Sequence, residues 1–86
     1  MDKRGGQVKI ILYTQSGWHA CTEEKAWLSQ HHTEFEERNI RDNVSYIDEV
    51  IALGSQSTPT TIIENETGQH VIVGFQIRSL KNHLKL

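Results

Sequence analysis

The order of its apolar segments constrains the fold of this chain more than any other feature. A nearly continuous apolar run over Gln7 to Tyr13 predicts a strand that is buried on both faces. Cys21 to His32 follows as a predicted helix, and Thr33 to Ile40 as a second, more polar strand. A strand–helix–strand unit of this kind joins parallel strands through a right-handed crossover. The first half of the chain therefore predicts a parallel pair of strands covered by a helix.

The second half begins with another helix. Apolar residues recur at helical spacing within Val44 to Leu53, which places Asp48 and Glu49 on the solvent side. Gly54 follows directly and is expected to end the helix, because glycine readily adopts the left-handed conformation found there.

A hairpin and a last helix complete the pattern. Thr60 to Ile63 and His70 to Phe75 are rich in β-forming residues and are separated by a polar, glycine-containing turn. Gln76 to Leu86 has the apolar spacing of a short amphipathic helix. The predicted order is β-α-β-α-β-β-α. We expect an α/β fold with a four-stranded mixed sheet, strand order 2-1-3-4, and helices on both faces.

Composition limits the class of protein. The 86 residues suit one domain, 1–86, in which 1–6 are expected to be loosely ordered. The net charge is −2 and the basic residues are scattered, which argues against nucleic-acid binding. No apolar run approaches the roughly 18 residues of a membrane span, so no membrane partner is expected. A single cysteine agrees with a reducing compartment, and we expect a cytoplasmic protein.

Short motifs recur along the chain in a familiar order. They are Tyr13-Thr14 at the end of the first strand, Cys21 followed by Lys25, Ala26 and Leu28, the stretch Ser57 to Thr60, and Val73 to Phe75. With these motifs the chain resembles the glutaredoxin family, and within it the small NrdH-type redoxins that pass electrons to ribonucleotide reductase. The resemblance implies a thioredoxin-like fold. It also implies thiol–disulfide exchange in cell redox homeostasis.

The active-site motif of that family is Cys-x-x-Cys, and here it is degenerate. By the spacing to Lys25, Cys21 corresponds to the second cysteine, and the first falls on Trp18. Disulfide reduction begins with thiolate attack, which Trp18 cannot perform. Catalysis, if any, is therefore monothiol and depends on Cys21. A lone cysteine is also often a buried, inert residue, and both readings remain open at this point.

Pro59, the only proline, directly precedes a predicted strand. A proline at the start of a strand is tolerated there simply because its missing N–H costs little. The family resemblance implies more: a cis Thr58–Pro59 bond, with the backbone of Thr58 presented to an extended thiol ligand. The resemblance implies a ligand groove formed by Tyr13, Trp18, Thr58, Pro59, Gly74 and Phe75.

The resemblance also bears on ligands and partners. Glutathione-using members carry Gly-Gly followed by an aspartate near the last helix, whereas this chain has only Gly74 followed by Phe75. That is the NrdH-like form, which implies a thioredoxin-reductase-type reductant and leaves glutathione doubtful. We expect no cofactor and no metal, because His19, His31 and His32 lack ligand spacing. The resemblance implies a protein thiol or disulfide as the partner. In the alternative, a catalytically silent binding module, we expect an extended peptide held beside Trp18 and Pro59.

Overall fold

The computed structural model describes residues 8–86. Its elements are β1 (Lys9–Thr14), α1 (His19–Gln30), β2 (Glu36–Asn39), α2 (Ser45–Ala52), β3 (Thr60–Asn65), β4 (Gly68–Val73) and α3 (Ile77–Leu84). This is the predicted order of strands and helices. The expectations for residues 1–6, and for a strand that starts at Gln7, lie outside the described residues.

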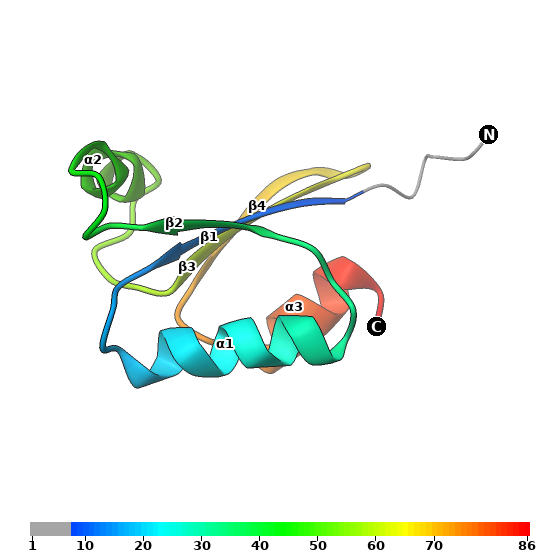
Figure 1. Ribbon diagram of the computed structural model, residues 1–86. Coiled ribbons are helices and arrows are strands. Elements are labelled where there is room, and N and C mark those ends of the chain that lie inside the picture. Colours follow the sequence, from blue (N-terminus) through cyan, green and yellow to red (C-terminus); the bar gives the residue numbers. More distant parts are fainter. Residues whose placement is uncertain (1–7) are drawn as a thin grey trace.

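The sheet has the predicted order, β2-β1-β3-β4. β1 pairs in parallel with β2, and β3 runs antiparallel to both β1 and β4. Figure 1 shows α1 and α3 on one face of the sheet and α2 on the other. The predicted thioredoxin-like architecture is confirmed. No helix within residues 8–86 is long and apolar enough to cross a membrane.

Alternation along the central strands builds one core on each face of the sheet. The core on the α1 and α3 face consists of Ile10, Ile63, Ile72 and Leu80, with Trp27, Phe35, Phe75 and Leu84 packed against it. The core on the α2 face consists of Ile11, Tyr13, Val50 and Ile62, with Ile40, Tyr46 and Leu53 against it. β1 lies between the two cores, which explains its continuous apolar run.

The start of α1 differs from the prediction. The helix begins at His19, two residues before Cys21, and Trp18 is its extended N-cap residue (φ −89°, ψ 120°). It ends at Gln30 because the chain turns at His32, which has a φ of 55°. This earlier start moves Glu24 from the first helical turn into the second.

Glycine ends α2 as predicted. Gly54 follows the C-cap residue Leu53 and has a φ of +84°, a conformation that side chains rarely adopt. The chain then returns through residues 55–59 to β3, and this return segment carries the proline.

Candidate functional site

The degenerate motif lies where β1 passes into α1. Trp18 is the N-cap residue, and its carbonyl accepts a hydrogen bond from the backbone N–H of Cys21 at 3.2 Å. The two side chains differ sharply in exposure: Trp18 is 51% exposed and Cys21 only 2%. The position of the family nucleophile is therefore an accessible aromatic side chain. The only thiol is enclosed one turn further along the helix.

The proline segment lies beside this loop. The Thr58–Pro59 bond is cis, the geometry that the family resemblance implies. The Thr58 hydroxyl donates to Oε1 of Gln15 at 3.5 Å, which connects the segment with the loop before Trp18. The N–H of Gly74 donates to the Pro59 carbonyl at 2.8 Å. The structure thus brings three of the predicted groove residues together.

Buried hydroxyl groups hold the proline segment from below. Ser55 and Thr60 are buried, and their hydroxyl oxygens lie 2.7 Å apart. The carbonyl oxygen of Ser57 lies within hydrogen-bond distance of both hydroxyl groups. Within residues 8–86, no hydrogen bond engages the backbone N–H or C=O of Thr58. The segment is fixed from inside, and its outer backbone groups remain free to pair with an extended chain.

Phe75 has a mainly structural position. It is half-buried and packs against the core on the α1 and α3 face. Gly74, directly before it, has a φ of +84° and turns the chain from β4 toward α3. Gly74 is therefore the member of this pair that lies beside the proline segment.

Tyr13 does not line a groove, contrary to the sequence-based expectation. It is 2% exposed and belongs to the core on the α2 face. Its hydroxyl donates to Glu49 at 2.7 Å and accepts from Arg38 at 3.2 Å. Strand alternation explains the error, because odd-numbered residues of β1 point toward α2. Glu49, expected on the solvent side of its helix, is half-buried instead and serves as the partner of Tyr13.

The three groups form one charged network. Arg38 also donates to Glu49 at 2.8 Å and to Glu36 at 2.6 Å. Burial, followed by the hydrogen bond to Glu49, raises the pKa of Tyr13. The hydrogen bond from Tyr13 lowers the pKa of Glu49. Sequence reasoning missed this network because its members are far apart in the chain.

We expect Tyr13→Phe to lower the free energy of unfolding by about 1 kcal/mol, the usual net value of one hydrogen bond. The loss stays small because Arg38 and Glu49 keep their direct contact. Tyr46→Phe is the matched control, since within residues 8–86 the Tyr46 hydroxyl has no hydrogen-bond partner. Urea unfolding of the two variants measures the difference. Equal stability of both would show that the Tyr13 hydroxyl contributes nothing.

A carboxyl group of α1 is buried beneath the motif. Glu24 is 1% exposed, and its Oε2 accepts a hydrogen bond from the hydroxyl of Thr61. Burial raises its pKa to about 7, opposed by the hydrogen bond from Thr61. The spacing of Cys21, Glu24 and Leu28 along one helix face was the available signal.

An apolar cavity of about 380 Å³ adjoins the proline segment on the α2 side. Its lining includes Gln15, Ile40, Ile47, Val50, Ile51 and Thr58. Two of these apolar side chains, Ile47 and Ile51, are exposed to solvent. Polar residues of the proline segment, Ser55, Gln56 and Ser57, line the rest of the cavity. The cavity thus combines aliphatic side chains with polar groups, and Thr58, whose backbone has no partner within residues 8–86, is part of its lining.

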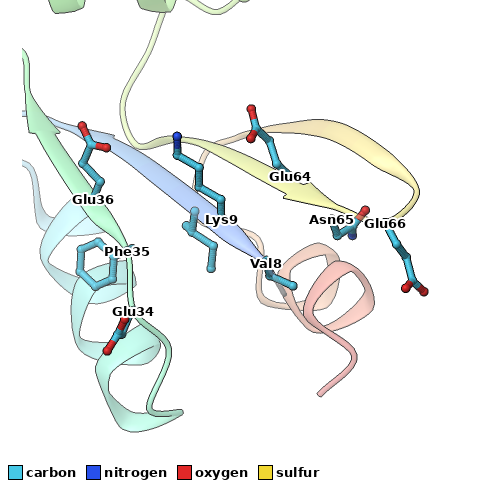
Figure 2. A pocket seen from close by; sticks show the side chains of 9 residues that line it. Val8, Lys9, Glu34, Phe35, Glu36, Glu64, Asn65 and Glu66 are labelled. Atoms are coloured by element: carbon cyan, nitrogen blue, oxygen red, sulfur yellow. The ribbon is translucent and has the colours of Figure 1, made fainter. Parts of the chain in front are cut away.

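A larger hollow, about 730 Å³, lies at the opposite end of the sheet. Figure 2 shows its lining, where Lys9 stands among glutamates from neighbouring strand ends. Lys9 begins β1 and Thr14 ends it, so about 16 Å of strand separates this hollow from the motif. The hollow is not part of the candidate site.

The histidines do not form a metal site in the described part of the chain. His19 contacts Glu23 at 3.3 Å on the exposed side of α1. Across residues 8–86, no three His, Cys, Asp or Glu side chains gather in a way that could hold a metal ion.

The comparison with known families accounts for this arrangement. The glutaredoxin family model matches residues 10–70. The chain belongs to the glutaredoxin family. The glutaredoxin-like protein NrdH of Lactococcus lactis subsp. lactis (strain IL1403) is 30% identical to it over 50 residues, which cover 58% of this chain and 69% of that protein. The sequence-based resemblance to glutaredoxins and NrdH-type redoxins is thereby confirmed.

The chain is also similar to a thioredoxin-like protein of known structure and to a transcriptional regulator. The crystal structure of the thioredoxin-like protein BC3987 superposes with a TM-score of 0.78 at 31% identity, covering 88% of this chain and 100% of that one. The global transcriptional regulator Spx 2 of Bacillus cereus is 39% identical over 41 residues, or 48% of this chain. That match spans only 31% of the regulator's length. Glutaredoxin membership supports thiol–disulfide redox chemistry in general terms.

Proposed function

We propose that this protein is a glutaredoxin-like redox protein that exchanges disulfides through the single thiol of Cys21. The observation that carries the proposal is the position of that thiol, at the start of α1 in a glutaredoxin fold, with an accessible Trp18 where the nucleophile would stand. No other thiol exists in the chain. Membership of the glutaredoxin family supports thiol–disulfide exchange, and the single thiol limits this exchange to a monothiol route.

The exchange needs two steps and an external thiol. The Cys21 thiolate attacks one sulfur of a partner disulfide. A new S–S bond forms, the old one breaks, and the released thiolate takes a proton from water. An external thiolate then attacks the mixed disulfide and releases Cys21. Because Cys21 is 2% exposed, the first step requires a local opening of α1. By analogy with NrdH-type redoxins, the external reductant is of the thioredoxin-reductase type and the compartment is the cytoplasm.

The partner that fits the site is an extended peptide carrying a thiol or disulfide. Thr58 offers an unpaired backbone edge, the kind of group with which a strand-like ligand pairs. The neighbouring aliphatic cavity suits an apolar side chain of that peptide, and exposed Trp18 provides a flat contact surface. Glutathione has charged ends and one thiol but no apolar side chain, so it would leave the cavity empty.

The same features support a second function, peptide binding without catalysis. The burial of Cys21 and the exposure of Trp18 favour it. In that case the groove beside Trp18 and Pro59 holds a partner segment, and the thiol is a core residue. The two functions differ in one measurable property, the ability of folded protein to form a mixed disulfide.

The test is mixed-disulfide formation by folded protein. We expect intact-mass spectrometry to find one adduct per chain after incubation with an excess of a cysteine-disulfide peptide, and none in Cys21→Ser. Glutathione disulfide should react more slowly than the peptide, since it cannot fill the apolar cavity. Ile51→Glu, which charges the cavity wall, should slow the peptide but not glutathione disulfide. If the unfolded chain reacts and the folded chain does not, the redox function is wrong and peptide binding remains.

A further inference from the structure

The buried face of α1 carries a carboxyl group next to the thiol. The buried residues of this helix are Cys21, Glu24 and Leu28, which lie on one stripe facing the sheet. Cys21 and Glu24 are one turn apart, and helical side chains lean toward the N-terminus of their helix. The side chain of Glu24 therefore extends back toward the turn that holds Cys21.

The carboxyl group of Glu24 is incompletely paired. Oε2 accepts the hydroxyl of Thr61 on β3, while Oε1 is buried and has no partner among the described residues. A buried carboxylate is stable only when it is paired and hydrogen-bonded. The ionised carboxylate of Glu24 would have no partner of opposite charge among the described residues, and only one of its two oxygens is hydrogen-bonded.

Among residues 8–86, no cation pairs with the carboxylate of Glu24. Lys25, the next residue on α1, pairs with Glu37 of β2 at 3.2 Å, and the same oxygen of Glu37 accepts the hydroxyl of Thr14 on β1. β4 and α3 contribute the uncharged Ile72 and Leu80 to the core on this face. The histidines of these two elements, His70 and His83, stack on each other with ring centroids 4.2 Å apart. Within residues 8–86, the titratable group that shares the buried stripe of α1 with Glu24 is the Cys21 thiol.

We propose that Glu24 couples pH to the exposure of Cys21. When Glu24 loses its proton, the closed arrangement of α1 on the sheet becomes less favourable, and the first turns of the helix open more often. The opening hydrates the carboxylate and exposes the thiol together, since both lie on the same stripe. This inference rests on the proposed function for its biological meaning, because an exposed Cys21 is the exchanging form.

The direction follows from proton linkage. In the open state the carboxyl ionises at its ordinary pKa of 4.5, whereas in the closed state its pKa is about 7. The opening equilibrium therefore rises between about pH 4.5 and 7 and then levels off. Over that interval the open fraction should grow by a few tens of fold or more. Above neutral pH Glu24 is ionised in both states and adds no further change.

The experiment compares wild type with Glu24→Gln at each pH from 5 to 8. The readout is the rate of Cys21 alkylation by iodoacetamide in folded protein. Thiol chemistry is common to both proteins, so the wild-type rate divided by the variant rate isolates the opening. We expect that ratio to rise by tens of fold between pH 5 and 7.5 and then level off. Glu23→Gln, an exposed neighbour on the same helix, should leave the ratio flat.

Amide hydrogen exchange of α1 provides a readout that does not depend on the thiol. The α1 amides should exchange through a smaller opening than the β3 amides, and in wild type alone that opening should become easier from pH 5 to 7. Thr61→Val removes the hydrogen bond that opposes the pKa rise, so its transition should move to higher pH. A flat alkylation ratio, or α1 amides that exchange only with the whole molecule, would overturn the inference. Loss of the mixed-disulfide adduct alone would overturn the redox function and leave this coupling standing.

Discussion

Replacement of Trp18 by cysteine should convert this protein into a disulfide reductase. We expect wild type to fail a standard insulin-reduction assay, because an indole holds the position that starts the dithiol exchange and the remaining thiol of Cys21 is buried. Any residual activity should vanish in Cys21→Ser. Trp18 lies one turn before Cys21, with its carbonyl bonded to the Cys21 N–H. That separation suits a disulfide without large backbone movement. The new thiol would be exposed at the N-terminus of α1, where the helix dipole favours a reactive thiolate.

Two variants separate this gain from side effects of removing the tryptophan. Trp18→Ser introduces a side chain of nearly the same size as cysteine but without sulfur, so this variant should not reduce insulin. Trp18→Cys combined with Cys21→Ser should form mixed disulfides that are not resolved within the chain, so its turnover should fall well below that of the single variant. If wild type matches Trp18→Cys, then Cys21 does not occupy the second position of the motif. If a folded Trp18→Cys stays inactive, the groove is suited to binding and not to redox exchange.

The fold could be predicted from sequence because its signals are local and mutually consistent. The apolar run of β1 predicted a central strand, and the strand–helix–strand order predicted the parallel pair. Gly54 marked the end of α2 through a backbone conformation that favours glycine. Each of these signals depends on neighbouring residues alone. The topology then follows from the handedness of the crossover and the closing hairpin.

The site was less predictable because burial of single polar residues depends on register. Glu24 is a buried carboxyl and not a surface charge because it lies on the same face of α1 as Cys21 and Leu28. Alternation along β1 decides whether Tyr13 faces the motif or the α2 core. Its partners, Arg38 and Glu49, come from two other elements and leave no local pattern. The family motif indicated where a ligand segment would lie, but not which side chains reach it.

The folded state should lose stability as Glu24 ionises, and Glu24→Gln should remove that loss. Burial raises the pKa of Glu24 from 4.5 to about 7. A carboxyl that binds its proton more tightly when folded stabilises the protein at low pH. That stability is fully present below pH 4.5 and is lost as the pH rises through 7. The difference corresponds to about 3 kcal/mol, a large share of the stability of a small domain.

The measurement is the free energy of unfolding in urea at pH 5 and pH 8. We expect Glu24→Gln to gain about 2.5 kcal/mol in free energy of unfolding relative to wild type between these two pH values, since the wild-type carboxyl is already partly ionised in the unfolded state at pH 5. The other titratable groups are common to both proteins and cancel in the comparison. Any fixed cost of burying the amide also cancels, since it is the same at each pH. Glu23→Gln should follow wild type, because that side chain is half exposed and contacts His19. A gain that does not change with pH would mean that Glu24 stays protonated, or is paired on ionisation, throughout the interval.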